Sequence, residues 1–191
     1  MAGFQVVIIG RFWVIAEVKA FANATPHSYV VLKGSTFIGW LSYEDIHKLP
    51  FRLCLFALLI SIEKAALDVL HKRPEVSISM LPVARVNKAK EIYAQRGYRK
   101  DPQGRERAGI LLDCTQFVDK FLIISNSDDL RSKLPAASPG FTKVAERLRN
   151  DLAHSSQDQK SSVLLKRESL LPFIESALKL QEQLLELSRG T

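Results

Sequence analysis

The chain has 191 residues, of which 47% are hydrophobic and 25% are charged, and this balance is typical of a folded globular protein rather than a disordered one. The formal net charge of +7 favours an anionic partner such as nucleic acid, because clustered cations attract polyphosphate backbones. The longest uninterrupted apolar run, over 53–60, is far too short to cross a membrane. We therefore expect one substantial domain with a small appendage.

The two cysteines, Cys54 and Cys114, have no metal-ligand spacing with each other or with a histidine. Both are expected to fill the core. The apolar stretch over 12–21 is interrupted by Glu17 and Lys19, so we expect no export signal. These features predict a reduced, cytoplasmic protein that uses no metal or cofactor and binds no membrane.

The first fifty residues mix strand and helix signals. β-branched and aromatic residues predict strands, and the glycine at position 34 falls between two such runs, as in a hairpin. The expected elements are a strand over 4–10, a helix over 13–24, a hairpin over 28–42 and a short helix over 43–48 that stops at Pro50.

From residue 51 onward the pattern is helical throughout. Pro82 and Gly97 mark the start and the end of one helix, and the sequence DCTQ at 113–116 resembles a capping box at the start of another. Five helices are expected, over 51–73, 82–96, 113–125, 141–155 and 169–188. The predicted fold is an up-and-down α-helical bundle of five helices over 51–191, preceded by a small α+β segment over 1–50.

The fourth predicted helix carries polar residues away from its apolar stripe. At about 100° per residue, Asn150 and His154 fall nearly opposite the stripe and Arg149 falls on its flank. We therefore expect all three to meet either water or another subunit. A purely structural interpretation also fits, because Glu146 with Arg149 has the spacing of a surface ion pair and a histidine near a helix end is favoured by the dipole.

The sequence RNDLAH, over 149–154, resembles the Arg-x4-6-His motif of the HEPN superfamily, and the helix order over about 51–189 resembles that family as well. Many HEPN proteins are metal-independent endoribonucleases in which two protomers form one composite site. The resemblance implies a homodimer that cleaves RNA, leaves a 2′,3′-cyclic phosphate, and serves as a toxin or defence component that an antitoxin controls.

Elementary chemistry agrees with this implication. Cleaving RNA without metal requires a group that moves protons near neutral pH, and His154 has a suitable side chain. It also requires a cation on the phosphate, and the guanidinium of Arg149 binds phosphate in a bidentate manner. Asn150 would orient His154 or bind phosphate.

Glu63 falls within the apolar arc of the first long helix, where an unpaired carboxylate is costly. It either faces the motif helix, holding Arg149 or tuning His154, or it forms a buried pair with some other arginine, or it lies at a wetter helix edge. An acidic residue on the first helix also resembles the HEPN pattern. The basic loop over 96–107, with Tyr98 among its cations, either guides RNA or is simply solvated.

Residues 30–46 resemble the second half of a CBS domain, through Gly34, the run 37–39 and the Ser-x-x-Asp segment from Ser42 to Asp45. The resemblance implies that Ser42 and Asp45 contact the ribose and phosphate of a regulatory nucleotide. Alternatively, Ser42 simply caps the short helix. Since a complete nucleotide-binding module pairs two such repeats, about 50 residues supply only half of one.

The sequence thus predicts a homodimeric endoribonuclease with Arg149, His154, Asn150 and Glu63 at its site. The alternative is a non-catalytic dimeric HEPN/CBS regulatory module that binds RNA, a nucleotide or a protein.

Overall fold

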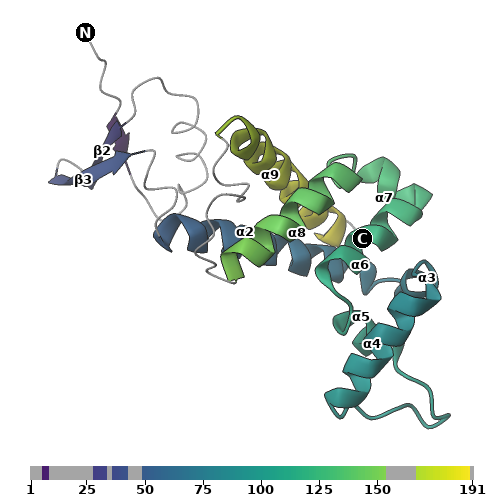
Figure 1. Cartoon of the computed structure of the whole chain (residues 1–191). Coiled ribbons are helices and arrows are strands. Elements are labelled where there is room, and N and C mark those ends of the chain that lie inside the picture. Colours follow the sequence, from purple (N-terminus) through teal and green to yellow (C-terminus); the bar gives the residue numbers. More distant parts are fainter. Residues whose placement is uncertain (1–5, 9–27, 34–35, 43–48, 154–166, 190–191) are drawn as a thin grey trace.

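The structure is a computed structural model that describes residues 6–8, 28–33, 36–42, 49–153 and 167–189. Three strands precede eight helices in this part of the chain (Figure 1). The strands are β1 (Val6–Ile8), β2 (Ser28–Lys33) and β3 (Thr36–Ser42). The helices are α2 (Leu49–Leu70), α3 (Pro74–Ser79), α4 (Val83–Gln95), α5 (Ala108–Asp113), α6 (Phe117–Asn126), α7 (Asp128–Lys133), α8 (Pro139–Ala153) and α9 (Arg167–Arg189).

The three strands form one sheet in the order β1-β2-β3. β2 and β3 pair antiparallel, so the predicted hairpin over 28–42 is present, and its register shifts between Val31 and Leu32. β1 pairs parallel to β2 with Val6 opposite Val30, which places a strand within the predicted run 4–10. The predicted helices over 13–24 and 43–48 lie outside the described residues.

The helical class predicted for the larger part of the chain is confirmed. The five predicted helices correspond to α2, α4, α6, α8 and α9, while the short helices α3, α5 and α7 were not predicted. Pro50 lies in the first turn of α2, where its missing N–H costs no intrahelical hydrogen bond.

The helix α2 lies at the centre of the bundle, where α6, α8 and α9 all pack against it (Figure 1). The face of α2 that carries Leu55, Leu59, Ile62, Ala66 and Leu70 is buried. Phenylalanine rings connect the neighbouring helices: the ring centroids of Phe121 on α6 and Phe141 on α8 are 6.1 Å apart, and those of Phe141 and Phe173 on α9 are 5.2 Å apart. The largest buried side chains of this core include Leu59, Ile62, Leu70, Phe121, Leu148 and Leu180.

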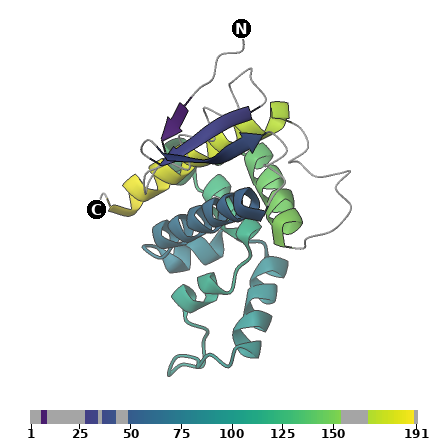
Figure 2. The same ribbon diagram turned by 90° about the vertical axis from the view of Figure 1, so that its left-hand side faces the viewer.

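The bundle differs from the five-helix prediction in one respect. α4 packs with α5 around a second, smaller core, and these helices extend together to one side of the bundle in both views (Figure 2). Tyr93 is the centre of this core, which also contains Ala89, Leu111 and Cys114. Four of the five predicted helices therefore share one core, whereas α4 belongs mainly to a smaller lobe and contacts the main core through Val86.

The start of α6 lies four residues later than predicted, because α5 occupies the residues expected to begin it. Cys114 closes α5, and the hydroxyl of Thr115 donates to the carbonyl oxygen of Leu112 at 2.6 Å. The capping box is formed instead by Gln116 and Asp119, and Asp119 Oδ2 accepts from the backbone N–H of Gln116 at 2.9 Å.

The amino-terminal half of α2 leaves part of its apolar surface uncovered. Leu53 is 56% exposed and Ile60 is 40% exposed. Cys54 is also exposed, so the prediction that it fills the core is wrong, whereas Cys114 is buried as predicted. Apolar residues occupy nearly all sides of this stretch, and the bundle covers only one of them. None of the described helices is both long enough and apolar enough to span a bilayer.

The two thiols are therefore expected to react very differently. Burial raises the pKa of the Cys114 thiol, which keeps it protonated and unreactive, although the nearby Arg96 guanidinium opposes part of the shift. Iodoacetamide at about pH 8 should alkylate Cys54 in the folded protein and Cys114 only after unfolding, as followed by mass spectrometry. Cys54→Ser should abolish labelling of the folded protein, and rapid native labelling of Cys114 would contradict this assignment.

Candidate functional site

Arg149 is held against the bundle rather than turned fully outward. Its side chain is 36% exposed, its Nη2 atom lies 3.7 Å from Glu63 Oε2, and its Cζ atom lies 5.9 Å from the centroid of the Phe117 ring. The Nε atom is inaccessible and has no hydrogen-bond partner among the described residues. The expectation that a single chain leaves this arginine to water or a second subunit is therefore wrong in part, because its flank position lets the side chain fold inward.

Asn150 is exposed on α8, as its position opposite the apolar stripe predicted. His154 follows the described end of α8 and lies outside the described residues. Ser42 is the last residue of β3, and Asp45 lies outside the described residues. The structure therefore brings Arg149 and Glu63 together and leaves the relation of His154, Ser42 and Asp45 to them undescribed.

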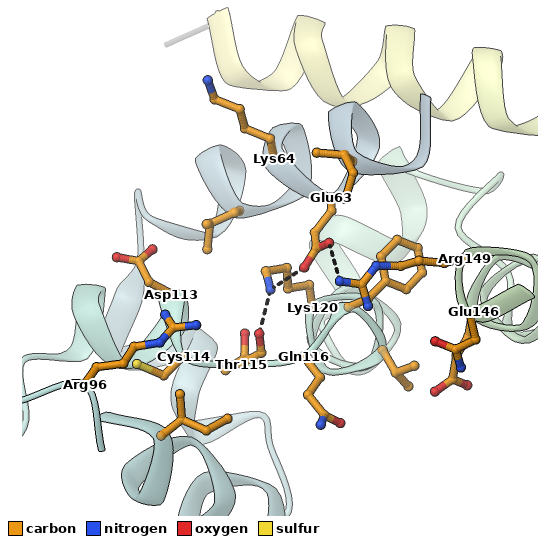
Figure 3. A pocket seen from close by; sticks show the side chains of 16 residues that line it. Glu63, Lys64, Arg96, Asp113, Cys114, Thr115, Gln116, Lys120, Glu146 and Arg149 are labelled. Carbon is orange, nitrogen blue, oxygen red and sulfur yellow. Dashed lines mark hydrogen bonds and ion pairs between the residues drawn. The ribbon is translucent and has the colours of Figure 1, made fainter. Parts of the chain in front are cut away.

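Glu63 forms ion pairs with two cations at once. Its Oε1 atom accepts a hydrogen bond from Lys120 Nζ at 3.0 Å, while its other oxygen faces Arg149 (Figure 3). The side chains of Glu63 and Lys120 are 18% and 3% exposed, so both charges are largely removed from water. Of the three interpretations of Glu63, the one in which it faces the motif helix and contacts Arg149 matches this geometry.

Lys120 is the site residue that the sequence interpretation missed. It lies on the buried face of α6, three residues after Phe117 and four before Ile124, and its ammonium also donates to the carbonyl oxygen of Thr115 at 2.9 Å. A lysine at such a position within an apolar stripe implies a buried acidic partner, because an unpaired ammonium is costly there. The sequence shows this lysine within the apolar stripe of α6, and its acidic partner in the structure is Glu63.

These residues line a cavity of about 620 Å³ between α2, α4, α6 and α8. Figure 3 shows Arg96, Asp113 and Cys114 toward one end, Arg149 and Glu146 toward the other, and Glu63 with Lys120 between them. The lining is mixed in character, since apolar side chains alternate with charged ones. The apolar members are Ile60, Leu67, Ile92, Phe117 and Val118.

His71 on the last turn after α2 pairs with a carboxylate from another helix. His71 Nε2 lies 2.9 Å from Asp113 Oδ1, at the end of α5. Both side chains are more than one-third exposed, so this pair contributes little to stability. Asp113 also lines the cavity.

The basic loop after α4 is ordered by contacts within itself. Lys100 Nζ lies 3.3 Å from Glu106 Oε1, and Arg105 Nε lies 3.2 Å from Asp101 Oδ2. Hydrogen bonds from the backbone and side chain of Arg105 lower the pKa of the Asp101 carboxyl. Tyr98 packs on Tyr93, with ring centroids 5.4 Å apart. These contacts favour the structural interpretation of this loop.

The shared ion pair yields a test of its contribution to stability. Glu63→Gln keeps the volume of the side chain but removes the charge that compensates the buried ammonium of Lys120. We expect the free energy of unfolding to fall by about 3 kcal/mol, as measured by urea denaturation followed by circular dichroism.

The matched control is Asp68→Asn, which neutralises an exposed carboxylate on the same helix. It should change the free energy of unfolding by less than about 0.5 kcal/mol. Equal effects of the two substitutions would show that the shared ion pair has no special weight.

The chain matches no protein-family model, no curated protein and no solved structure. The resemblances to the HEPN superfamily and to a CBS domain, which were drawn from the motifs at 149–154 and 30–46, therefore remain predictions. The function proposed below combines the motif at 149–154 with the residues of the cavity and the chemistry that both can perform.

Proposed function

We propose that this chain is a metal-independent endoribonuclease that acts as a homodimer. Arg149 binds the phosphate that is cleaved, His154 moves the protons, and Asn150 and Glu63 position them. The ribose 2′-oxygen bonds to phosphorus as the bond from phosphorus to the 5′-oxygen breaks. One basic group takes the proton of the 2′-hydroxyl and one acid gives a proton to the leaving 5′-oxygen, so the products are a 2′,3′-cyclic phosphate and a 5′-hydroxyl.

The observation that carries this proposal is the fixed guanidinium of Arg149 at the wall of the cavity. Glu63 contacts it on one side and the Phe117 ring supports it on another. A cation that is held in place before the substrate binds needs little reorganisation energy as charge develops on the phosphate. Its planar group matches two oxygens of a phosphate.

The local charge balance also suits an anionic substrate. Glu63 carries one negative charge and faces two cations, Lys120 and Arg149. One positive charge is therefore left over within this cluster. Because Lys120 is almost fully buried while Arg149 is partly exposed, the excess is accessible mainly through Arg149.

A second copy of the chain would complete the site. One chain supplies a single motif, whereas the proposed reaction needs one group to accept a proton and another to donate one. Asn150 is exposed beside Arg149, so this face of α8 is open to a partner. We further propose that the nuclease serves as a toxin or defence component that an antitoxin regulates. Ser42 and Asp45 of the CBS-like segment would bind a regulatory nucleotide.

The rival function is a non-catalytic dimeric module that binds RNA, a nucleotide or a protein. The observation that favours it is the same ion pair, because Glu63 offsets part of the charge with which Arg149 would stabilise a transition state. The Nε atom of Arg149 is also inaccessible. Such a module would retain RNA without cutting it.

Purified protein incubated with end-labelled RNA in excess EDTA separates these functions. We expect cleavage that persists in EDTA and yields 2′,3′-cyclic phosphate ends, detected on a denaturing gel before and after phosphatase treatment. Arg149→Ala and His154→Ala should each lower the rate by about 100-fold or more, because each removes a group that acts in the transition state.

Arg147→Ala is the matched control, since it removes an exposed arginine from the same helix. It should leave the rate within about twofold of the wild type, and sedimentation should show whether each variant keeps its oligomeric state. Intact RNA retained by the protein supports the rival module. Loss of cleavage in EDTA overturns the metal-independent mechanism, and a fully active monomer overturns the composite site.

A further inference from the structure

The cavity beside Arg149 extends well beyond what one phosphate group occupies. Its volume of about 620 Å³ lies in the range of sites that hold whole organic ligands. Figure 3 shows that Arg149 and Arg96 lie toward opposite ends, with the Glu63–Lys120 pair between them. One cation at each end of an extended cavity suits a ligand that carries more than one phosphate.

Arg96 is available for such a contact. It is the residue that closes α4, and it forms no ion pair with any carboxylate of the described residues. Its neighbour at the cavity wall is the buried thiol of Cys114, whose raised pKa leaves it uncharged, so the guanidinium keeps its full charge. Asp113, the carboxylate at the same end, is engaged with His71.

The remaining lining suits the parts of a nucleotide that are not phosphate. Ile60, Leu67 and Ile92 contribute apolar surface, and Ile60 is 40% exposed and therefore accessible. Aliphatic side chains can bury the apolar faces of bases through contacts that select no sequence. Asn150, Gln116 and Lys64 add polar groups to the lining.

We propose that the cavity binds single-stranded RNA along its length, with one phosphate on Arg149 and a phosphate further along the strand on Arg96. This inference rests on the proposed function in one respect, because it takes RNA as the ligand. It assigns Arg96 to substrate binding and places the strand across α2, α4 and α6 rather than on α8 alone. Binding is then independent of base identity and depends on the length of the strand.

Isothermal titration calorimetry with 2′-O-methyl oligonucleotides tests this inference without cleavage, because these ligands lack the attacking hydroxyl. Arg96→Ala should weaken hexanucleotide binding by about 5- to 10-fold and leave binding of a dinucleotide without terminal phosphates unchanged, since its single phosphate is held by Arg149. Arg149→Ala should weaken binding at both lengths. For hexanucleotide binding, the slope of log K against log salt concentration should become shallower by about 0.7 for each lost phosphate contact.

Arg131→Ala is the matched control, because Arg131 is exposed on α7 and does not line the cavity. It should bind both ligands like the wild type, and Arg96→Lys should retain most of the hexanucleotide affinity. Thermal unfolding of Arg96→Ala should match that of the wild type if the loss is one of binding.

Equal binding by Arg96→Ala and Arg131→Ala at both lengths overturns the inference, as does a wild-type protein that binds neither ligand. An effect of Arg96→Ala on the dinucleotide as large as that on the hexanucleotide also overturns it. Arg96-dependent binding in a protein that cleaves no RNA leaves this inference standing and removes the nuclease. RNA cleavage by a protein whose RNA binding does not depend on Arg96 supports the nuclease and overturns this inference.

Discussion

The carboxylate of Glu63 is the point on which the candidate site depends. It is largely withdrawn from water and compensates a lysine ammonium that is withdrawn almost completely. Either charge alone would be strongly destabilising in this environment, so α2 and α6 must present these two side chains to each other. Arg149 then uses the second oxygen of the same carboxylate, which adds α8 to the cluster. Three helices that are distant in sequence thus meet around one negative charge.

The aromatic side chains make this meeting point rigid. Phe117 lies under the Arg149 guanidinium and packs against Phe121, which in turn contacts Phe141 with ring centroids 6.1 Å apart. The contacts continue to Phe173 on α9. The polar cluster therefore packs directly against the hydrophobic core through the Phe117 ring, and close packing holds the core side chains in single rotamers.

Hydrophobic periodicity was sufficient to predict the five longer helices, because each buries a stripe with helical spacing. It was insufficient for α3, α5 and α7, which have six residues each and are too short to show a period. It also placed the start of α6 too early, since Asp113 and Gln116 have the spacing of a capping box and nothing local reveals that α5 already uses Asp113. The partners of a helix are decided by tertiary packing, which is why the separate lobe of α4 was missed.

The site was predictable to the extent that it depends on single helices. The apolar arc of α2 pointed to Glu63 as an acid in need of a partner, and helix geometry placed Arg149 on a flank. Lys120 required a comparison between two helices, which the spacing within either one does not provide. The inward turn of Arg149 follows from the presence of that carboxylate and of the Phe117 ring, and both belong to other helices.

Asp119 joins the outlying lobe to the site. This carboxylate, only 2% exposed, receives the backbone N–H that begins α6 and lies 3.2 Å from Arg85 Nη1 on α4. Arg85 of α4 therefore contacts the first turn of α6, the helix that carries both Phe117 and Lys120. One buried carboxylate thus links α4 to the helix that forms part of the cavity wall.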